Sequence, residues 1–153
     1  MNKKYFFLVL VLILVAVGGA GYYFWPRQAD PGMLLIQNYE RAMRADIYGG
    51  KTPEETLKMF VEALKKEDVE LASKYFLLDD NGSREKWVVF LDDLKQRQVM
   101  IKLSEDINSK AEPENGLYEG DYKFLLRNKD KTVGLQIDME LNKYSGVWKI
   151  ESL

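Results

Sequence analysis

The side chains best placed for metal chemistry lie in the segment DDNGSRE, where oxygen-bearing residues recur at Asp79, Asn81, Ser83 and Glu85. Alternate oxygen ligands are typical of calcium loops, but those loops place a glycine at the sixth position and a glutamate at the twelfth. Here Gly82 stands at the fourth position and no glutamate at the twelfth. An Asx turn that leads into a serine helix cap explains the same residues. The sequence therefore predicts no metal site.

Two residue types are missing from the whole chain of 153 residues, cysteine and histidine. Without cysteine there is no disulfide, thiolate nucleophile, zinc–thiolate site or lipidated cysteine. Without histidine the usual general base and the commonest transition-metal ligand are absent. The 22 basic residues do not outnumber the 24 acidic ones, so nucleic-acid binding is not expected. Phosphate loops, dinucleotide fingerprints and serine nucleophile elbows are also missing, and we expect no cofactor.

The strongest signal concerns location. An uninterrupted apolar run, Tyr5–Trp25, is long enough as a helix to cross about 30 Å of hydrocarbon. Two lysines precede this run and aromatic residues close it. This pattern predicts an anchor in the plasma (inner) membrane, with the N-terminus in the cytoplasm and the chain after Pro26 outside. The alternative is a signal peptide cleaved after Ala20, but the continuation of the run to Trp25 favours retention.

The sequence divides into an anchor (1–25), a juxtamembrane segment (26–50) and one globular domain (51–153). In the juxtamembrane segment, a thin apolar stripe predicts a helix over Met33–Ile47, as a spacer or as a self-association helix.

The first half of the domain has helical periodicity. Thr52 is expected to cap a helix that runs to about Lys66, with Glu55 completing a capping box. A second short helix is expected after Asp68, and a third helix after a cap at Ser83. The segment 99–107 is ambiguous between helix and strand, and we favour a short helix or an irregular link.

From Leu117 onward the hydrophobic period changes from 3.6 to 2. Three alternating runs, separated by turns at 128–131 and 142–146, predict an antiparallel meander with one packed and one solvated face. In the last run, Lys149 and its neighbour Glu151 are expected on the solvated face. Residues 109–115 could add a leading strand. Helices followed by three to four strands predict an α+β fold.

Two stretches, TPEETLKMFVEALKKEDVELASKYF and the closing GVWKIESL, carry a family resemblance. Together they make residues 52–153 similar to nuclear transport factor 2-like domains, a superfamily with a cystatin-like α+β roll. The resemblance implies a curved sheet wrapped around the helices, with a cone-shaped cavity between them. Many bacterial members are envelope proteins of unknown function that are membrane-anchored or lipidated.

The resemblance also suggests a candidate cavity, because members similar to ketosteroid isomerase use cavity carboxylates and a tyrosine. Tyr118 and Tyr122 would be the hydroxyl groups, on the inner face of the first long strand. Asp121 and Asp138 fall on the outer face by alternation, so neither could act as a base inside the cone. The residues expected to line or fill the cavity are Tyr118, Tyr122, Phe124, Trp87 and Trp148.

These features favour a non-catalytic binding or assembly module of the bacterial envelope. It would be anchored in the lipid bilayer through its N-terminal helix, with an envelope protein or a second copy of itself as partner. One alternative is a small-molecule-binding or isomerase-like enzyme that uses the cavity. Another is an inner-membrane assembly subunit of type IV secretion, which has a similar layout but usually a longer cytoplasmic tail.

Overall fold

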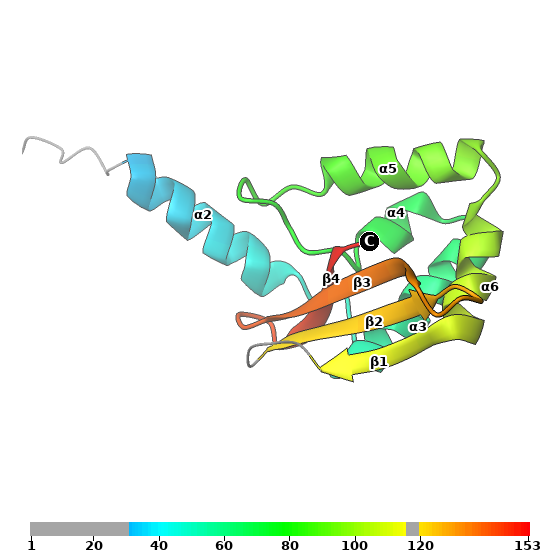
Figure 1. The fold of residues 1–153 in the computed structure, drawn as a ribbon. Helices are drawn as coiled ribbons and strands as arrows, with labels where there is room; N and C mark the ends of the chain where they lie inside the picture. The colour runs from blue at the N-terminus through cyan, green and yellow to red at the C-terminus, as the bar shows by residue number, and fades with distance from the viewer. Residues whose placement is uncertain (1–30, 116–119) are drawn as a thin grey trace, which may run out of the picture. The chain divides into compact units, whose positions relative to one another are not determined.

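The computed structural model describes residues 31–115 and 120–153. These residues form an α+β fold in which the helices come first and the strands follow, as predicted (Figure 1). The helices are α2 (Pro31–Ala45), α3 (Pro53–Lys65), α4 (Val69–Ser73), α5 (Glu85–Gln96) and α6 (Met100–Lys110). The strands are β1 (Ala111–Asn115), β2 (Asp121–Arg127), β3 (Val133–Asn142) and β4 (Val147–Ser152). The ambiguous segment 99–107 is helical from Met100 onward and belongs to α6, and the optional leading strand is β1.

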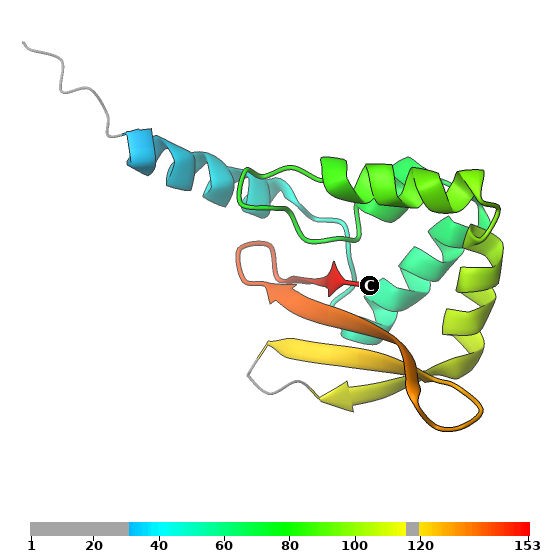
Figure 2. The ribbon, with the colours of Figure 1, turned by 45° about the horizontal axis from the view of Figure 1, so that its top comes forward.

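The four strands form an antiparallel meander in the order β1-β2-β3-β4. Helices α3 and α6 pack on each other and against this sheet, α3 on β4 and α6 on β1 and β2, while α4 and α5 pack together (Figure 2). The alternation predicted for β3 is confirmed where Ile137 and Met139 are buried and Gln136 is exposed. The largest fully buried apolar side chains of the core are Phe60, Leu64, Phe76, Leu91, Met100, Ile107, Ile137, Met139 and Ile150.

The start of α3 follows the predicted cap with one difference. Thr52 Oγ1 accepts a hydrogen bond from the Glu55 N–H at 3.2 Å, as the sequence predicts. The Glu55 carboxylate accepts from the Lys51 N–H at 2.7 Å, instead of from the Thr52 N–H that a capping box requires. The predicted capping box is therefore half formed, and Glu55 instead caps the residue before the helix cap.

Helix α5 begins differently from the prediction. Ser83 Oγ does accept a hydrogen bond from the Glu85 N–H at 3.1 Å, but the residue at the cap position is Arg84. The Arg84 side chain turns inward, where its Nε donates to the Phe76 carbonyl at 3.1 Å. This tertiary contact shifts the helix start by one residue relative to the serine cap.

The outer edge of β4 is closed by segments that are distant in sequence. The Trp148 N–H donates to the Gly50 carbonyl at 3.0 Å, and the Ile150 N–H donates to the Tyr75 carbonyl at 2.9 Å. Gly49 has φ +141°, and a Cβ on it would lie 2.4 Å from the Trp148 carbonyl oxygen. Only glycine permits this close approach. The edge strand β4 is thus shielded, and the end of the juxtamembrane segment is held against it.

The prediction that Lys149 faces solvent is wrong. Val147 and Lys149 are buried on the face of β4 opposite Ile150, whereas Glu151 is exposed as expected. The segment after α2 and the segment after α4 cover this face. Both faces of β4 are therefore packed over most of its length.

Within residues 31–115 and 120–153, no helix is both long and apolar enough to cross a bilayer. The predicted anchor Tyr5–Trp25 and the candidate cavity residue Tyr118 lie outside the described residues.

Candidate functional site

Three of the predicted cavity residues come together on the sheet. The Tyr122 ring lies 5.3 Å from the ring of Phe124 and 6.2 Å from that of Trp148, measured between centroids, with edge contacts in both pairs. Phe124 is buried in the core, and the two other rings pack against its border. The Tyr122 ring thus contacts both of the other rings directly, as packed core residues do.

The fourth described residue, Trp87, packs against the same core but contacts other aromatic rings. Its ring stacks on Phe76 at 4.1 Å and meets Phe90 edge-on at 6.3 Å. The indole N–H donates to the Leu77 carbonyl at 3.2 Å, so its polar atom is satisfied by the backbone. The sequence predicts Trp87 in the same cavity as Tyr122; in the structure both residues pack against one core, but their rings contact different aromatic neighbours.

The Tyr122 hydroxyl makes the contact most similar to an acid–base pair, donating to Glu54 Oε1 at 2.8 Å. Burial raises the pKa of Tyr122, and the adjacent Glu54 carboxylate raises it further. Burial also acts to raise the pKa of Glu54, but hydrogen bonds from the backbone and from Tyr122 outweigh it, so that pKa is lowered. General acid–base catalysis needs pKa values near the operating pH. Here both values move away from neutrality, which makes Tyr122 a weaker acid and Glu54 a weaker base.

Replacing Tyr122 with phenylalanine should leave the fold intact and lower the free energy of unfolding by at most about 1 kcal/mol, because the lost hydrogen bond is exposed. The pKa of Glu54 should rise towards its ordinary value, because one of its stabilising donors is removed. Urea denaturation and NMR titration of the Glu54 side chain measure the two effects. An unchanged Glu54 pKa would contradict the hydrogen bond.

The predicted Asx turn is present at Asp79, whose Oδ1 accepts from the N–H groups of Asn81 at 3.0 Å and Ser83 at 2.8 Å.

The Asp138 carboxylate on β3 accepts from the Gln136 amide at 2.7 Å and from the Ser152 hydroxyl at 2.6 Å. In the part of the chain that the structure describes, no three acidic side chains are grouped so as to hold a metal ion.

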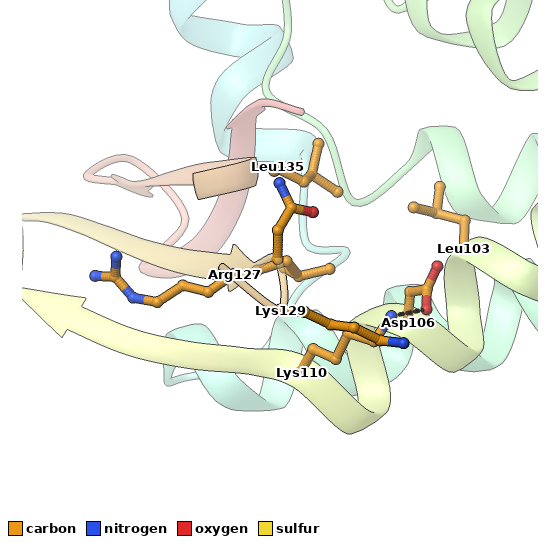
Figure 3. A pocket seen from close by; sticks show the side chains of 9 residues that line it. Leu103, Asp106, Lys110, Arg127, Lys129 and Leu135 are labelled. Carbon is orange, nitrogen blue, oxygen red and sulfur yellow. Dashed lines mark hydrogen bonds and ion pairs between the residues drawn. The ribbon is translucent and has the colours of Figure 1, made fainter. Parts of the chain in front are cut away.

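A groove of about 430 Å³ lies between α6 and the turn that joins β2 to β3 (Figure 3). Its lining combines leucines with polar and charged residues: Leu103, Leu126, Leu135, Asp106, Lys110, Arg127, Asn128, Lys129 and Gly134. Lys110 is paired with Asp106 at 2.5 Å. The Arg127 guanidinium extends away from these groups and pairs with Glu112 on β1 at 3.4 Å. The groove has the size of a small-molecule site, but most of its charges are already paired.

The most unusual polar group of the domain is buried and ionic, formed by Asp46, Arg84 and Lys149, and we refer to it as the ionic cluster. The Lys149 side chain is fully buried, and that of Asp46 is 2% exposed. Lys149 Nζ donates to Asp46 Oδ1 at 2.7 Å. It also donates to the carbonyls of Tyr48 and Lys74, both at 2.6 Å. The second Asp46 oxygen pairs with Arg84 Nη2, so both carboxylate oxygens have a cationic partner.

The ionic cluster fastens the end of α2 to the domain. Asp46 directly follows α2, Arg84 directly precedes α5, and Lys149 lies in the middle of β4. A neighbouring hydrogen bond also attaches α2 to the domain: the Asn142 amide donates to the Met43 carbonyl in the last turn of α2 at 2.9 Å. Met43 is itself buried. One apolar and two polar attachments therefore hold the end of α2 in place.

Burial lowers the pKa of Lys149 to about 8, although Asp46 acts to raise it; Arg84 lowers it further. Since the unfolded chain keeps this proton up to its ordinary pKa of 10.5, it binds more protons than the folded protein between about pH 8 and 10.5. The free energy of unfolding contributed by Lys149 should therefore increase with pH in this window.

Between pH 7.5 and 9.5 we expect this increase to amount to about 1–2 kcal/mol. The variant Lys149→Met should lack it, because methionine does not titrate. Urea denaturation of both proteins at the two pH values measures the difference. An equal response to pH in the two proteins would contradict the lowered pKa of Lys149.

No pattern in the sequence indicates the ionic cluster. A lysine between two apolar strand residues ordinarily lies on the solvated face, and an aspartate after a helix is ordinarily exposed.

Comparisons of the chain with protein-family models, with curated proteins and with solved structures find no match.

Proposed function

We propose that this protein is a membrane-anchored, non-catalytic module that holds its α+β domain outside the cytoplasmic membrane, for binding to or assembly with a protein of the bacterial envelope. The observation that carries the proposal is the attachment of α2. This helix begins at Pro31, six residues after the end of the predicted span at Trp25. At its other end the ionic cluster and Met43 fix it to the domain. A helix attached in this way is suited to hold a domain at a membrane surface.

Two further observations support a non-catalytic role. The described residues of the predicted cavity, such as Phe124 and Trp148, contact neighbouring aromatic rings. The Tyr122–Glu54 pair has pKa shifts opposite to those that acid–base catalysis needs. Membership of the nuclear transport factor 2-like superfamily, with its curved sheet, is part of the same proposal and is supported by the helix-then-meander order.

The topology is tested by fusing alkaline phosphatase after Leu153 in a bacterial host. Because this enzyme is active only outside the cytoplasm, the proposal expects active fusions that stay in the membrane after carbonate extraction. A matched fusion that lacks residues 5–25 should be inactive and soluble. An inactive full-length fusion would overturn the topology. Release of an active fusion by carbonate, with a new N-terminus at Gly21, would instead show a cleaved signal peptide.

A ligand-binding role is a second candidate, favoured by the groove between α6 and the β2–β3 turn. Its volume of about 430 Å³ lies within the range of small-molecule sites. Screening small molecules by amide NMR tests this role. Shifts confined to Lys110, Lys129 and Gly134 would support the groove as a site, and their absence across the screen would reject it.

A further inference from the structure

The first turns of α2 expose an unusual amount of apolar surface. Met33, Leu34, Leu35 and Ile36 are consecutive, and between 46% and 69% of each residue is exposed. We refer to them as the apolar turn. No charged residue occurs in α2 before Glu40. Large apolar side chains exposed together mark a surface that is covered by a partner.

The geometry of the apolar turn indicates what kind of partner covers it. Consecutive helical residues are about 100° apart around the axis, so four in a row surround the helix completely. A second copy of the chain, or any partner on one side, would leave part of this surface in water. An all-round apolar helix is typical of a segment in an apolar medium. Further along α2 the pattern becomes one-sided, because Met43 is buried and Arg44 is exposed.

The position of the apolar turn in the chain favours the bilayer as that medium. Met33 follows the end of the predicted span, Trp25, by eight residues. Eight residues span at most about 28 Å, so the apolar turn stays close to the membrane surface. The polar layer on each side of the hydrocarbon core is roughly 5–8 Å thick. The connecting chain is therefore long enough for the apolar turn to reach through this layer to the hydrocarbon boundary.

We infer that the apolar turn inserts into the same membrane that Tyr5–Trp25 is proposed to cross, at the boundary between the headgroup layer and the hydrocarbon. Its partner is thus a lipid surface, and α2 binds the membrane at one end and the domain at the other. The inference rests on the proposed function, since a chain without an anchor would not be held at a membrane. It goes beyond that function because it assigns a second membrane-binding element.

The absence of cysteine from the chain allows a direct test with single-cysteine variants of the full-length protein. In the Leu35→Cys variant, an environment-sensitive fluorophore is attached to the new cysteine. The labelled protein is reconstituted into phosphatidylcholine nanodiscs, with one protein molecule in each nanodisc. Val133→Cys is the matched control, an exposed apolar residue at the start of β3. We expect a blue-shifted Leu35 label that loses fluorescence when headgroup-region spin-labelled lipids are added. The Val133 label should be quenched by aqueous iodide instead.

Two results would overturn the inference. A Leu35 label that iodide quenches as well as the Val133 label would place the apolar turn in water. A label that becomes shielded only when two copies share a nanodisc, without quenching by lipid, would identify a second copy as the partner.

Failure of the anchor is recognised separately, because the protein would then not be recovered with the nanodiscs. In that case the labelled protein is mixed with phosphatidylcholine vesicles. A blue shift of the Leu35 label would still support lipid binding by the apolar turn, and an unchanged spectrum would overturn it. Circular dichroism of each variant verifies that the helices are retained.

Discussion

Replacing Asp46 with asparagine should lower the free energy of unfolding by about 3–5 kcal/mol at neutral pH. The substitution keeps the shape of the side chain but removes its charge, so the fully buried Lys149 ammonium loses its only ionic partner among the described residues. Arg84, at 20% side-chain exposure, loses its carboxylate as well. Urea denaturation measures the cost. Hydrogen exchange at Met43 should quicken in parallel, because the attachment of α2 is weakened.

Asp93→Asn is the matched control, because Asp93 pairs with Arg97 on the exposed surface of α5. Its cost should be below about 1 kcal/mol. The double variant Asp46→Asn/Lys149→Met should be more stable than the sum of the single effects predicts, since removing both charges leaves neither one unpaired. Equal costs for Asp46→Asn and Asp93→Asn would show that the ionic cluster does not hold α2.

Replacing Phe76 with alanine should lower the free energy of unfolding by about 3–5 kcal/mol. Phe76 is fully buried, contacts Phe60 edge-on at 5.3 Å and stacks on Trp87. Its carbonyl also accepts from Arg84, which links this part of the core to the ionic cluster. Chemical denaturation measures the loss, with Val89→Ala on the exposed face of α5 as a control that should change stability by less than about 0.5 kcal/mol.

The stability loss of the Phe76→Ala variant also tests whether the interior is close-packed. In a close-packed core the removed ring leaves a cavity, which costs free energy and can bind a small apolar probe such as benzene. An interior built around an open cone would rearrange at lower cost. A loss of less than about 1 kcal/mol would therefore contradict the packed interior on which the non-catalytic proposal depends.

The sequence by itself predicted the elements whose signals are local. The Thr52 cap and the apolar spacing after it predicted α3, and the Asp68 cap predicted α4. The change of period to 2, with turns near 128–131 and 142–146, predicted the meander. These features depend on interactions between residues a few positions apart, so one stretch of sequence contains most of the information. The anchor Tyr5–Trp25 is a prediction of the same kind.

Only the tertiary structure showed where β4 packs and how α2 is attached. The Lys149–Asp46 contact joins residues 103 positions apart, and the second face of β4 is covered by segments from two other parts of the chain. Alternation along a strand indicates which residues share a face, but it does not indicate whether another segment covers that face. For the same reason the sequence did not show which rings Trp87 and Trp148 contact: both pack against one core, but Trp87 stacks on Phe76 and Trp148 meets Tyr122 edge-on. Which residues become buried together is decided by long-range packing, which no local pattern contains.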